Sequence, residues 1–454
     1  MKRFLSLVLL MAGLVSAQET SISVPNTRFV LPNGLTVILH EDHTVPAATV
    51  NVWYHVGSGR EKPNRTGFAH LFEHIMFEGS GNVPEGKFDE WLEAAGGDNN
   101  GSTTTNRTNY YENIPSNAVE LALFLESDRM GYLLTAMSPA KVDGQRDVVK
   151  NERRQRMENQ PYGMVSVIQS ENMYPPDHPY HWPTIGYMPD LTAASYDDVV
   201  DFFKKYYVPN NASLCVAGDI NPAMIKALVE KWFTEIPSGA PVPRMNVPTP
   251  TLAEEKRLVY EDNVQLPRLY IAWHSPAIYT AADAQLDVLA DILAGGKNSR
   301  LYKRLVYDLQ IAQDVSAFQA SESLSSTFEI VATARTGHTL AELERVIQEE
   351  VNKIRTTAPE QREVQRAVNQ FEASFLNRIE RIGGKADQLN GYYFYTGNPD
   401  YFNDDLRRYK TLTATDVKSV AETFLKDNAR LVLSVVPKGK KELSAAGSKE
   451  VTVQ

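Results

Sequence analysis

Cysteine is nearly absent from this sequence, since Cys215 is the only one among 454 residues. A chain with one cysteine cannot form an internal disulfide, and it cannot build a metal site from several thiolates. Cys215 lies in the apolar segment 213–217, which is typical of a buried strand, so we expect a small core residue and not a nucleophile. Any metal site must therefore use histidine and carboxylate ligands.

Positive charge and long apolar runs are scarce as well. The net charge of −10 argues against nucleic acid as the main partner, because binding phosphates requires a basic face. The contents of 43% hydrophobic and 22% charged residues are those of a soluble globular protein. Beyond the N-terminus, no segment approaches the roughly 20 apolar residues that a membrane span needs.

The first residues have the pattern of an export signal. Lys2 and Arg3 precede an apolar run over residues 4–15, and Ser16 and Ala17 supply small residues at a cleavage position. We therefore predict a signal peptide at residues 1–17, whose removal leaves Gln18 at the new N-terminus. A membrane anchor is the alternative, and the shortness of the apolar run disfavours it.

The length and one proline-rich segment predict two domains. A chain of 454 residues exceeds what one hydrophobic core usually supports. Five prolines between residues 236 and 252 indicate a stiff, extended linker. We predict a first domain at 24–236, a linker at 237–256, a second domain at 257–438, and a flexible tail at 439–454 that is poor in periodicity.

The two halves share an internal sequence repeat, called the echo below. Leu191-Thr192-Ala193 is followed by Val199 and Phe203, and Leu412-Thr413-Ala414 is followed at the same offsets by Val420 and Phe424. Each copy then runs into an apolar strand. Chance similarity between two amphipathic helices is the alternative, but the similar order of elements around both copies favours two α+β domains of similar topology.

One short segment carries the chemistry. Residues 67–77 contain His70, Glu73 and His74 in the order H-x-x-E-H, within a predicted helix at 66–78. Residues four apart lie on one face of a helix, so the two histidines can bind one ion while Glu73 lies beside it. A polar helix face with two solvated histidines is the alternative reading.

A catalytic zinc site usually needs a third protein ligand and one open position for water. A predicted helix at 138–158 offers Glu152, which follows two valines. Spacing alone does not choose it over four other glutamates, namely Glu85, Glu90, Glu93 and Glu158. In such a site Glu73 would take a proton from water and later deliver it to a leaving amine.

The sequence resembles the inverted-motif zinc peptidases, the family of pitrilysin, insulysin and mitochondrial processing peptidase. The resemblance covers nearly the whole mature chain. It rests on the H-x-x-E-H segment and on further matches at 31–35, 57–61, 96–111, 178–186 and 207–219. It implies two similar α+β domains, each an antiparallel sheet flanked by helices, that together form half of a clamshell.

The resemblance also implies roles for residues. It places one Zn²⁺ per chain on His70, His74 and Glu152, with Glu73 as the general base. Gln145 stands where the family often has a glutamate that supports the third ligand. Extended peptides would add a strand to the edge at 99–105, with substrate contacts from five residues: Asn99, Asn100, Gly101, Ser102 and Thr103.

One departure from the family pattern bears on partners. Active members commonly use an Arg and a Tyr from a C-terminal domain, and Val306 and Gln313 stand at the matching positions here. Arg300 and Tyr307 have the right separation, and we leave open whether they replace the pair. The resemblance implies a second subunit of the same family that lacks H-x-x-E-H but supplies this pair, or else a homodimer.

The leading hypothesis is therefore an exported zinc endopeptidase subunit in a bacterial periplasm. A non-catalytic assembly subunit is an alternative, and the intact H-x-x-E-H motif argues against it. A peptide-binding subunit with a vestigial metal site is a further one.

Overall fold

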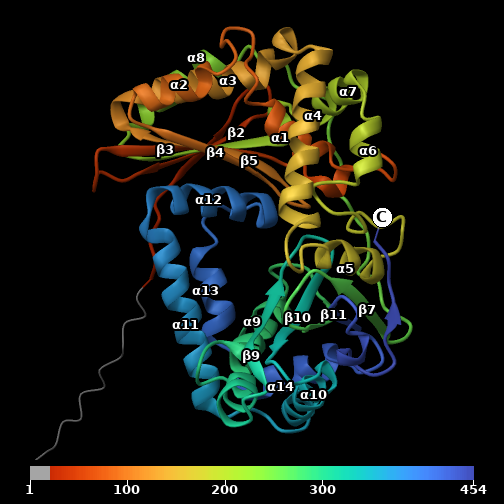
Figure 1. The fold of residues 1–454 in the computed structure, drawn as a ribbon. Helices are drawn as coiled ribbons and strands as arrows, with labels where there is room; N and C mark the ends of the chain where they lie inside the picture. The colour runs from red at the N-terminus through yellow and green to blue at the C-terminus, as the bar shows by residue number, and fades with distance from the viewer. Residues whose placement is uncertain (1–20, 454) are drawn as a thin grey trace, which may run out of the picture.

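The computed structural model describes residues 21–453 and divides them into two domains, each built on a six-stranded sheet (Figure 1). The predicted signal peptide lies outside the described residues. In the first domain, helices cover the outer face of a sheet with strand order β1-β2-β6-β3-β5-β4. Its strands are β1 (Thr27–Val30), β2 (Thr36–Glu41), β3 (Ala47–Tyr54), β4 (Asp98–Thr103), β5 (Thr108–Pro115) and β6 (Ala212–Gly218). Its helices are α1 (Phe68–Ile75), α2 (Lys87–Ala94), α3 (Val119–Ala136), α4 (Pro139–Arg153), α6 (Met188–Ala193), α7 (Tyr196–Tyr206) and α8 (Pro222–Phe233).

The second domain repeats this plan with the strand order β12-β7-β11-β8-β10-β9. Its strands are β7 (Lys256–Asp262), β8 (Arg268–Ser275), β9 (Ala312–Ala320), β10 (Ser326–Ala334), β11 (Leu431–Pro437) and β12 (Lys449–Glu450). Its helices are α9 (Ala281–Ala294), the π-helix η5 (Tyr302–Asp308), α10 (Leu340–Thr356), α11 (Gln361–Glu380), α13 (Phe402–Lys410) and α14 (Ala414–Phe424).

Five neighbouring strands of each sheet correspond in order and direction, which confirms the predicted pair of similar domains. The edge strands β1 and β12 differ, because β1 is antiparallel to β2 whereas β12 is parallel to β7. β6 lies between a parallel neighbour, β2, and an antiparallel neighbour, β3. β11 has the same position between parallel β7 and antiparallel β8. The sheets are thus mixed and not purely antiparallel as expected, because a late strand of each domain, β6 or β11, returns parallel to an early one.

The internal echo is present, but its register differs from the sequence match. Helices α7 and α14 both have 11 residues, and both begin with a capping box, at Ser195 and at Thr413. Aligned by these caps, Val199 corresponds to Val417 and not to Val420. A shift of three residues keeps apolar side chains on nearly the same face of a helix, so the apolar pattern alone did not distinguish the two registers.

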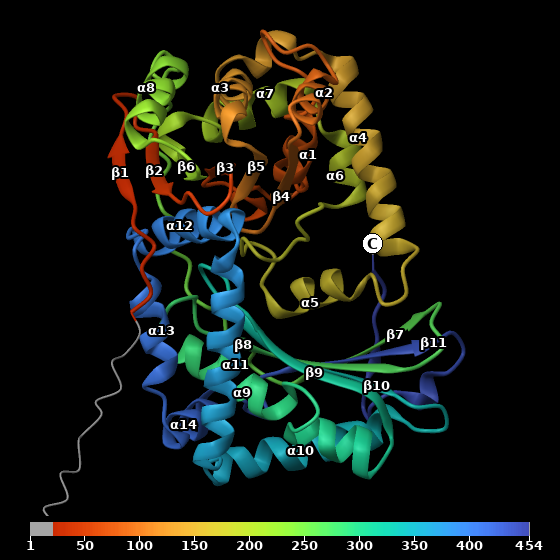
Figure 2. The same cartoon turned by 90° about the vertical axis from the view of Figure 1, so that its left-hand side faces the viewer.

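Each half of the chain lends a helix to the other half's sheet (Figures 1 and 2). Helix α12 (Ile382–Thr396) comes from the second half and packs on β3 and β6 of the first sheet. Its Leu389 and Tyr392 lie in one apolar cluster with Ile38 and Cys215. Cys215 is fully buried there, as expected for a core residue.

Helix α5 (Val165–Met173) makes the reciprocal contact. It comes from the first half, and its Val165 and Ile168 share a cluster with Leu431 and Leu433 of the second sheet. Helices α12 and α5 therefore each pack against the sheet formed by the other half of the chain.

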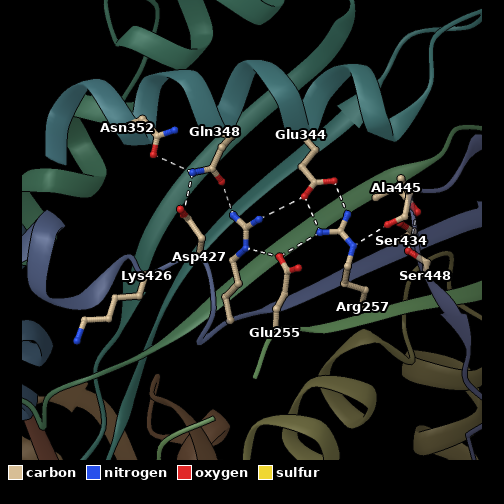
Figure 3. A network of polar contacts seen from close by, with 12 residues as sticks. Glu255, Arg257, Glu344, Gln348, Asn352, Lys426, Asp427, Ser434, Ala445 and Ser448 are labelled. Atoms are coloured by element: carbon tan, nitrogen blue, oxygen red, sulfur yellow. Dashed lines mark hydrogen bonds and ion pairs between the residues drawn. The ribbon is translucent and has the colours of Figure 1, made fainter. Parts of the chain in front are cut away.

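The C-terminal residues are folded, contrary to the expected flexible tail. Strand β12 pairs with β7, and the backbone N–H of Ala445 donates to Ser434 Oγ at 3.0 Å. Arg257 Nε donates to the carbonyl of Ala446 at 2.6 Å, while its guanidinium also binds Glu344 (Figure 3). These long-range polar contacts hold a segment whose own composition has little periodicity. Within residues 21–453, no helix is both long and apolar enough to cross a membrane.

Candidate metal centre

Helix α1 carries two of the predicted ligands, and its N-terminus is firmly anchored. The buried carboxylate of Glu61 accepts hydrogen bonds from the backbone N–H groups of Gly67, at 2.9 Å, and Ala69, at 2.8 Å. Gly67 precedes the helix with φ of 86°, and a Cβ there would lie 2.6 Å from the carbonyl oxygen of Ile185, so only glycine fits. One face of α1 is buried in the core through four residues: Phe68, Leu71, Phe72 and Ile75.

His70, His74 and Glu152 converge as predicted. One ligand atom from each lies within 4.8 Å of the others, and this is the one such group among residues 21–453. Glu152 Oε2 is 3.6 Å from His70 Nε2 and 3.1 Å from His74 Nε2. Ligand atoms about 2.0–2.1 Å from a tetrahedral zinc lie about 3.3 Å apart, so the three residues fit this ion.

Electrostatics also favour the ligating forms of these side chains. Burial lowers the pKa of His70 to about 4, so its imidazole is neutral and has a free lone pair at pH 7. The hydrogen bond from His74, assisted by the charge of Arg156, lowers the pKa of Glu152, whose carboxylate is ionised. Two imidazoles and one carboxylate match a catalytic zinc site that keeps one position open.

Glu152 reaches the site because of its place on α4, which packs against α1. Val149, one turn earlier, is fully buried, whereas Val148 is 46% exposed, so the face that carries Val149 and Glu152 points inward. The helix changes to a π-helix at Arg154–Glu158 directly after the ligand. Arg156 Nη1 then lies 2.6 Å from Glu152 Oε1, the oxygen that faces away from the histidines.

Glu73 lies between α1 and the edge strand β4. Thr103 Oγ1 donates to Glu73 Oε2 at 2.5 Å. A Cβ at Gly101 would lie 3.1 Å from Glu73 Cγ, so the small residue leaves room for the carboxylate. Burial raises the pKa of Glu73, which brings this carboxylate closer to the range of a general base near neutral pH.

The five residues predicted to contact substrate all lie on β4, which pairs only with β5 within residues 21–453 and leaves its other edge free. Asn99 is held by Asp89, Asn100 accepts from the N–H of Gly101, and Ser102 donates to Asn109. Of the five, Thr103 lines the cavity beside the ligands. Their contact with substrate stays a prediction.

Gln145 occupies a different place from the one that the family pattern suggests. Its Nε2 donates to Glu78 Oε1 at 2.5 Å, and it makes no hydrogen bond to a metal ligand. Among the other glutamates considered, Glu158 accepts from Arg153, Glu85 pairs with Lys141, and Glu90 pairs with Lys87. Glu93 also stays outside the ligand group.

Arg300 and Tyr307 do not reach the metal ligands of their own chain. The guanidinium of Arg300 donates to both carboxylate oxygens of Glu363, at 2.8 and 2.7 Å, and Tyr307 is 72% exposed. Neither residue lines the cavity beside His70. Val306 packs at the margin of the second core, and Gln313 is exposed on β9.

A cavity of about 560 Å³ lies beside the ligands and extends to the second sheet. Sequence reasoning missed three charged residues of its lining, Arg156, Glu322 and Glu329. Arg156 follows Glu152 by four positions, a helical spacing that was available as a signal. The two glutamates come from the other domain, and nothing in their local sequence places them near His70.

Comparison with known proteins gives consistent matches along the chain. Residues 36–173 match the family described as insulinase (peptidase family M16), and residues 193–371 match the description "Peptidase M16 inactive domain". The "Zinc protease PqqE" of Helicobacter pylori is 28% identical over 442 residues, covering 95% of this chain and 98% of that protein.

A plant relative and two solved structures agree with these matches. The "Probable mitochondrial-processing peptidase subunit beta" of Arabidopsis thaliana is 24% identical, covering 93% of this chain and 81% of that protein. The crystal structure of a protease from Helicobacter pylori has a TM-score of 0.86 at 26% identity, covering 91% of this chain and all of that one. A peptidase M16 inactive domain from Pseudomonas fluorescens shares the fold, with a TM-score of 0.81 at 17% identity over 94% of this chain and all of that one.

Proposed function

Because this chain belongs to the insulinase family of peptidases, family M16, we propose that it is the metal-bearing subunit of an exported zinc-dependent endopeptidase. The observation that carries the proposal is the convergence of His70, His74 and Glu152, with Glu73 one residue before the second histidine. The relatives named as zinc proteases support the same activity class.

The roles of the residues follow from their positions. Bound at the three ligands, zinc would lower the pKa of a water molecule from 15.7 to about 7 and polarise a peptide carbonyl. Glu73 takes a proton from the attacking water and returns it to the leaving amine. The raised pKa of Glu73 assists this proton transfer. The free edge of β4 offers backbone groups to an extended peptide.

We further propose that a second subunit completes the site. Arg300 is held by Glu363 and Tyr307 is exposed away from the cavity, so neither supplies a cation or a phenol to substrate within this chain. A family member without H-x-x-E-H that provides an Arg and a Tyr is the partner that fits best, and a homodimer is the alternative. The basic, then apolar N-terminal residues support export, and we propose the bacterial periplasm as the compartment.

The test combines metal content with peptide cleavage. The purified chain and its Glu73→Gln variant are each analysed for zinc and incubated with a quenched fluorescent peptide library, with and without the candidate partner. We expect one zinc per chain in both proteins, cleavage that needs the partner, and a loss of about 10²–10⁴-fold in rate for the variant.

Two results would overturn parts of this proposal. Absence of bound zinc at micromolar free metal would remove the peptidase assignment and favour a non-catalytic assembly subunit. Full activity of the chain alone as a homodimer would remove the need for a second kind of subunit.

A further inference from the structure

The two oxygens of Glu152 have different surroundings. Its Oε2 lies 3.6 Å from His70 Nε2 and 3.1 Å from His74 Nε2, on the side where the three ligands converge. Its Oε1 lies 2.6 Å from Arg156 Nη1 on the opposite side. Hydrogen bonds between a guanidinium and a carboxylate are among the strongest in proteins. One oxygen therefore faces the place of the ion, while the other is bound to a cation.

Arg156 provides most of the outer support that the structure gives to the three ligands. Within residues 21–453, it is the one Lys or Arg that forms an ion pair with any of them. The second nitrogen of a metal-bound histidine usually has a hydrogen-bond partner. The buried Nδ1 of His70, however, has none in the described part of the chain. Gln145 binds Glu78 instead of a ligand. Support for the site is thus concentrated on Glu152.

The backbone that carries Arg156 is held by a buried neighbour. Arg156 lies in the π-helix at 154–158 that begins directly after α4, and π-turns are frequent at functional sites. Arg153, which is 1% exposed, donates to Glu158 Oε1 at 3.2 Å and to the carbonyl of Gly186 at 2.8 Å. These contacts fix both ends of the π-helix. The side chain of Arg156 is itself 77% exposed, so its contact with Glu152 starts from an ordered backbone.

The contact with Arg156 bears on how many oxygens Glu152 can offer to an ion. A carboxylate can bind a metal through one oxygen or through both, and a small rotation of the group changes one mode into the other. A catalytic zinc site with three protein ligands keeps its fourth position for water, and a second oxygen from Glu152 would crowd that position. With Oε1 bound to Arg156, only Oε2 is directed toward the histidines.

We propose that Arg156 is a positioning residue that restricts Glu152 to binding the ion through one oxygen and so keeps the water position open. The inference rests on the proposed function of the site and adds a residue that acts on the metal through a ligand. Loss of such outer contacts typically costs 10- to 100-fold in activity or metal affinity. Because Arg156 is mostly exposed and water competes for the same oxygen, we expect an effect of about tenfold.

The test measures coordination separately from cleavage. The chain is loaded with Co²⁺ in place of zinc, because the visible absorption bands of this ion weaken as its ligands increase from four to five. We expect the intense bands of a four-coordinate ion in the parent, weaker bands in Arg156→Leu, and most of the parent intensity in Arg156→Lys, which retains a donor. Arg154→Leu is the matched control, since Arg154 lies in the same π-helix and binds Asn151 instead of a ligand. With zinc and the partner subunit, kcat of Arg156→Leu should fall about tenfold at a KM within about twofold of the parent.

The outcomes separate this inference from the proposed function. Equal spectra for the parent and Arg156→Leu mean that water replaces the guanidinium, which overturns the role of Arg156 and leaves peptidase activity standing. The expected loss of intensity in a chain that cleaves no peptide with any partner supports the role of Arg156 and counts against peptidase activity. An equal loss in Arg154→Leu assigns the change to the π-helix as a whole and overturns the specific contact. A chain that binds no Co²⁺ at micromolar free metal overturns both.

Discussion

At the scale of single residues, the hydroxyl of Thr103 connects the metal helix to the strand on which substrate is expected. Its hydrogen bond holds one oxygen of Glu73, the residue proposed to move the proton, while Thr103 itself lies on β4. A carboxylate that swings freely would spend less time in reach of the attacking water. We therefore expect Thr103 to position Glu73, in addition to the substrate contact that stays a prediction for its strand.

Replacing Thr103 by valine should lower kcat without changing metal content. Valine keeps the shape and removes the donor, and hydrogen bonds to charged groups contribute about 1.5–3 kcal/mol, which corresponds to a loss of roughly 10- to 100-fold. We expect a KM within about twofold of the parent, because the backbone of β4 is unchanged. Steady-state kinetics with one cleaved peptide, alongside zinc analysis, measures both quantities.

The matched control is Thr103→Ser, which retains the hydroxyl and should recover most of the rate. If serine and valine reduce kcat equally, the methyl group and not the hydrogen bond is what matters. If valine raises KM alone, Thr103 acts on substrate and not on Glu73.

Only part of the metal site could be predicted from the spacing of residues in the sequence. His70, Glu73 and His74 follow from helical spacing, because all three lie within two turns of one helix. Glu152 is 78 positions beyond His74. Spacing did not distinguish it from several other glutamates, and the family resemblance alone identified it as the third ligand. The hydrogen bond of Thr103 and the wall formed by Glu322 depend on how distant elements pack, which local pattern does not encode.

At the scale of elements, the exchanged helix α12 is fixed to the first sheet by polar contacts as well as apolar ones. The buried side chain of Asn390 donates to the carbonyl of Asn51 at 2.9 Å, and Trp53 Nε1 donates to Asp387 at 3.0 Å. A polar group buried at such a contact stabilises one docking position, because any other leaves it without a partner.

Asn390→Ala should therefore destabilise the protein by about 1–3 kcal/mol, the cost of leaving buried backbone and side-chain groups of Asn51 unpaired. Chemical denaturation monitored by tryptophan fluorescence gives the free energy of unfolding. Asn298→Ala, at an exposed position, should change it by less than about 0.5 kcal/mol. Equal effects of the two variants would contradict the role of Asn390 in docking α12.

The elements themselves were easier to predict than their assembly. The predicted helix at 66–78 contains α1, and the predicted helix at 138–158 covers α4 and the π-helix that follows it, because apolar periodicity and flanking turn residues mark both. The echo between α7 and α14 was shifted by three residues, since the apolar face tolerates that shift and the capping boxes do not. The tail has little periodicity of its own, and much of its order comes from β7 and Arg257, which lie far away in the sequence.

At the scale of the whole molecule, the helix exchange places one partly buried histidine at each junction. His55 lies against Phe394 of α12, with ring centroids 4.9 Å apart, and its Nε2 is 3.2 Å from Ser213 Oγ. His274, on the second sheet, has its Nε2 2.8 Å from the carbonyl oxygen of Met173, the last residue of α5. Burial lowers the pKa of both histidines to about 4. Both junctions thus require neutral imidazoles.

This arrangement predicts acid-sensitive docking of the two domains. A histidine with a folded pKa near 4 and an unfolded pKa near 6.5 binds more protons when unfolded, so its contribution is present above pH 6.5 and is lost as pH falls toward 4. Between pH 7 and pH 5, each histidine should remove about 2 kcal/mol from the free energy of unfolding.

His55→Gln and His274→Gln keep polar atoms at these positions without the titration, so the double variant should lose about 4 kcal/mol less than the parent over this interval. Urea denaturation at both pH values, with a chelator throughout so that metal loss does not contribute, measures the difference. Parallel losses in parent and variant would place the acid sensitivity elsewhere, whereas a flatter profile in the variant would assign it to the two imidazoles beside the exchanged helices.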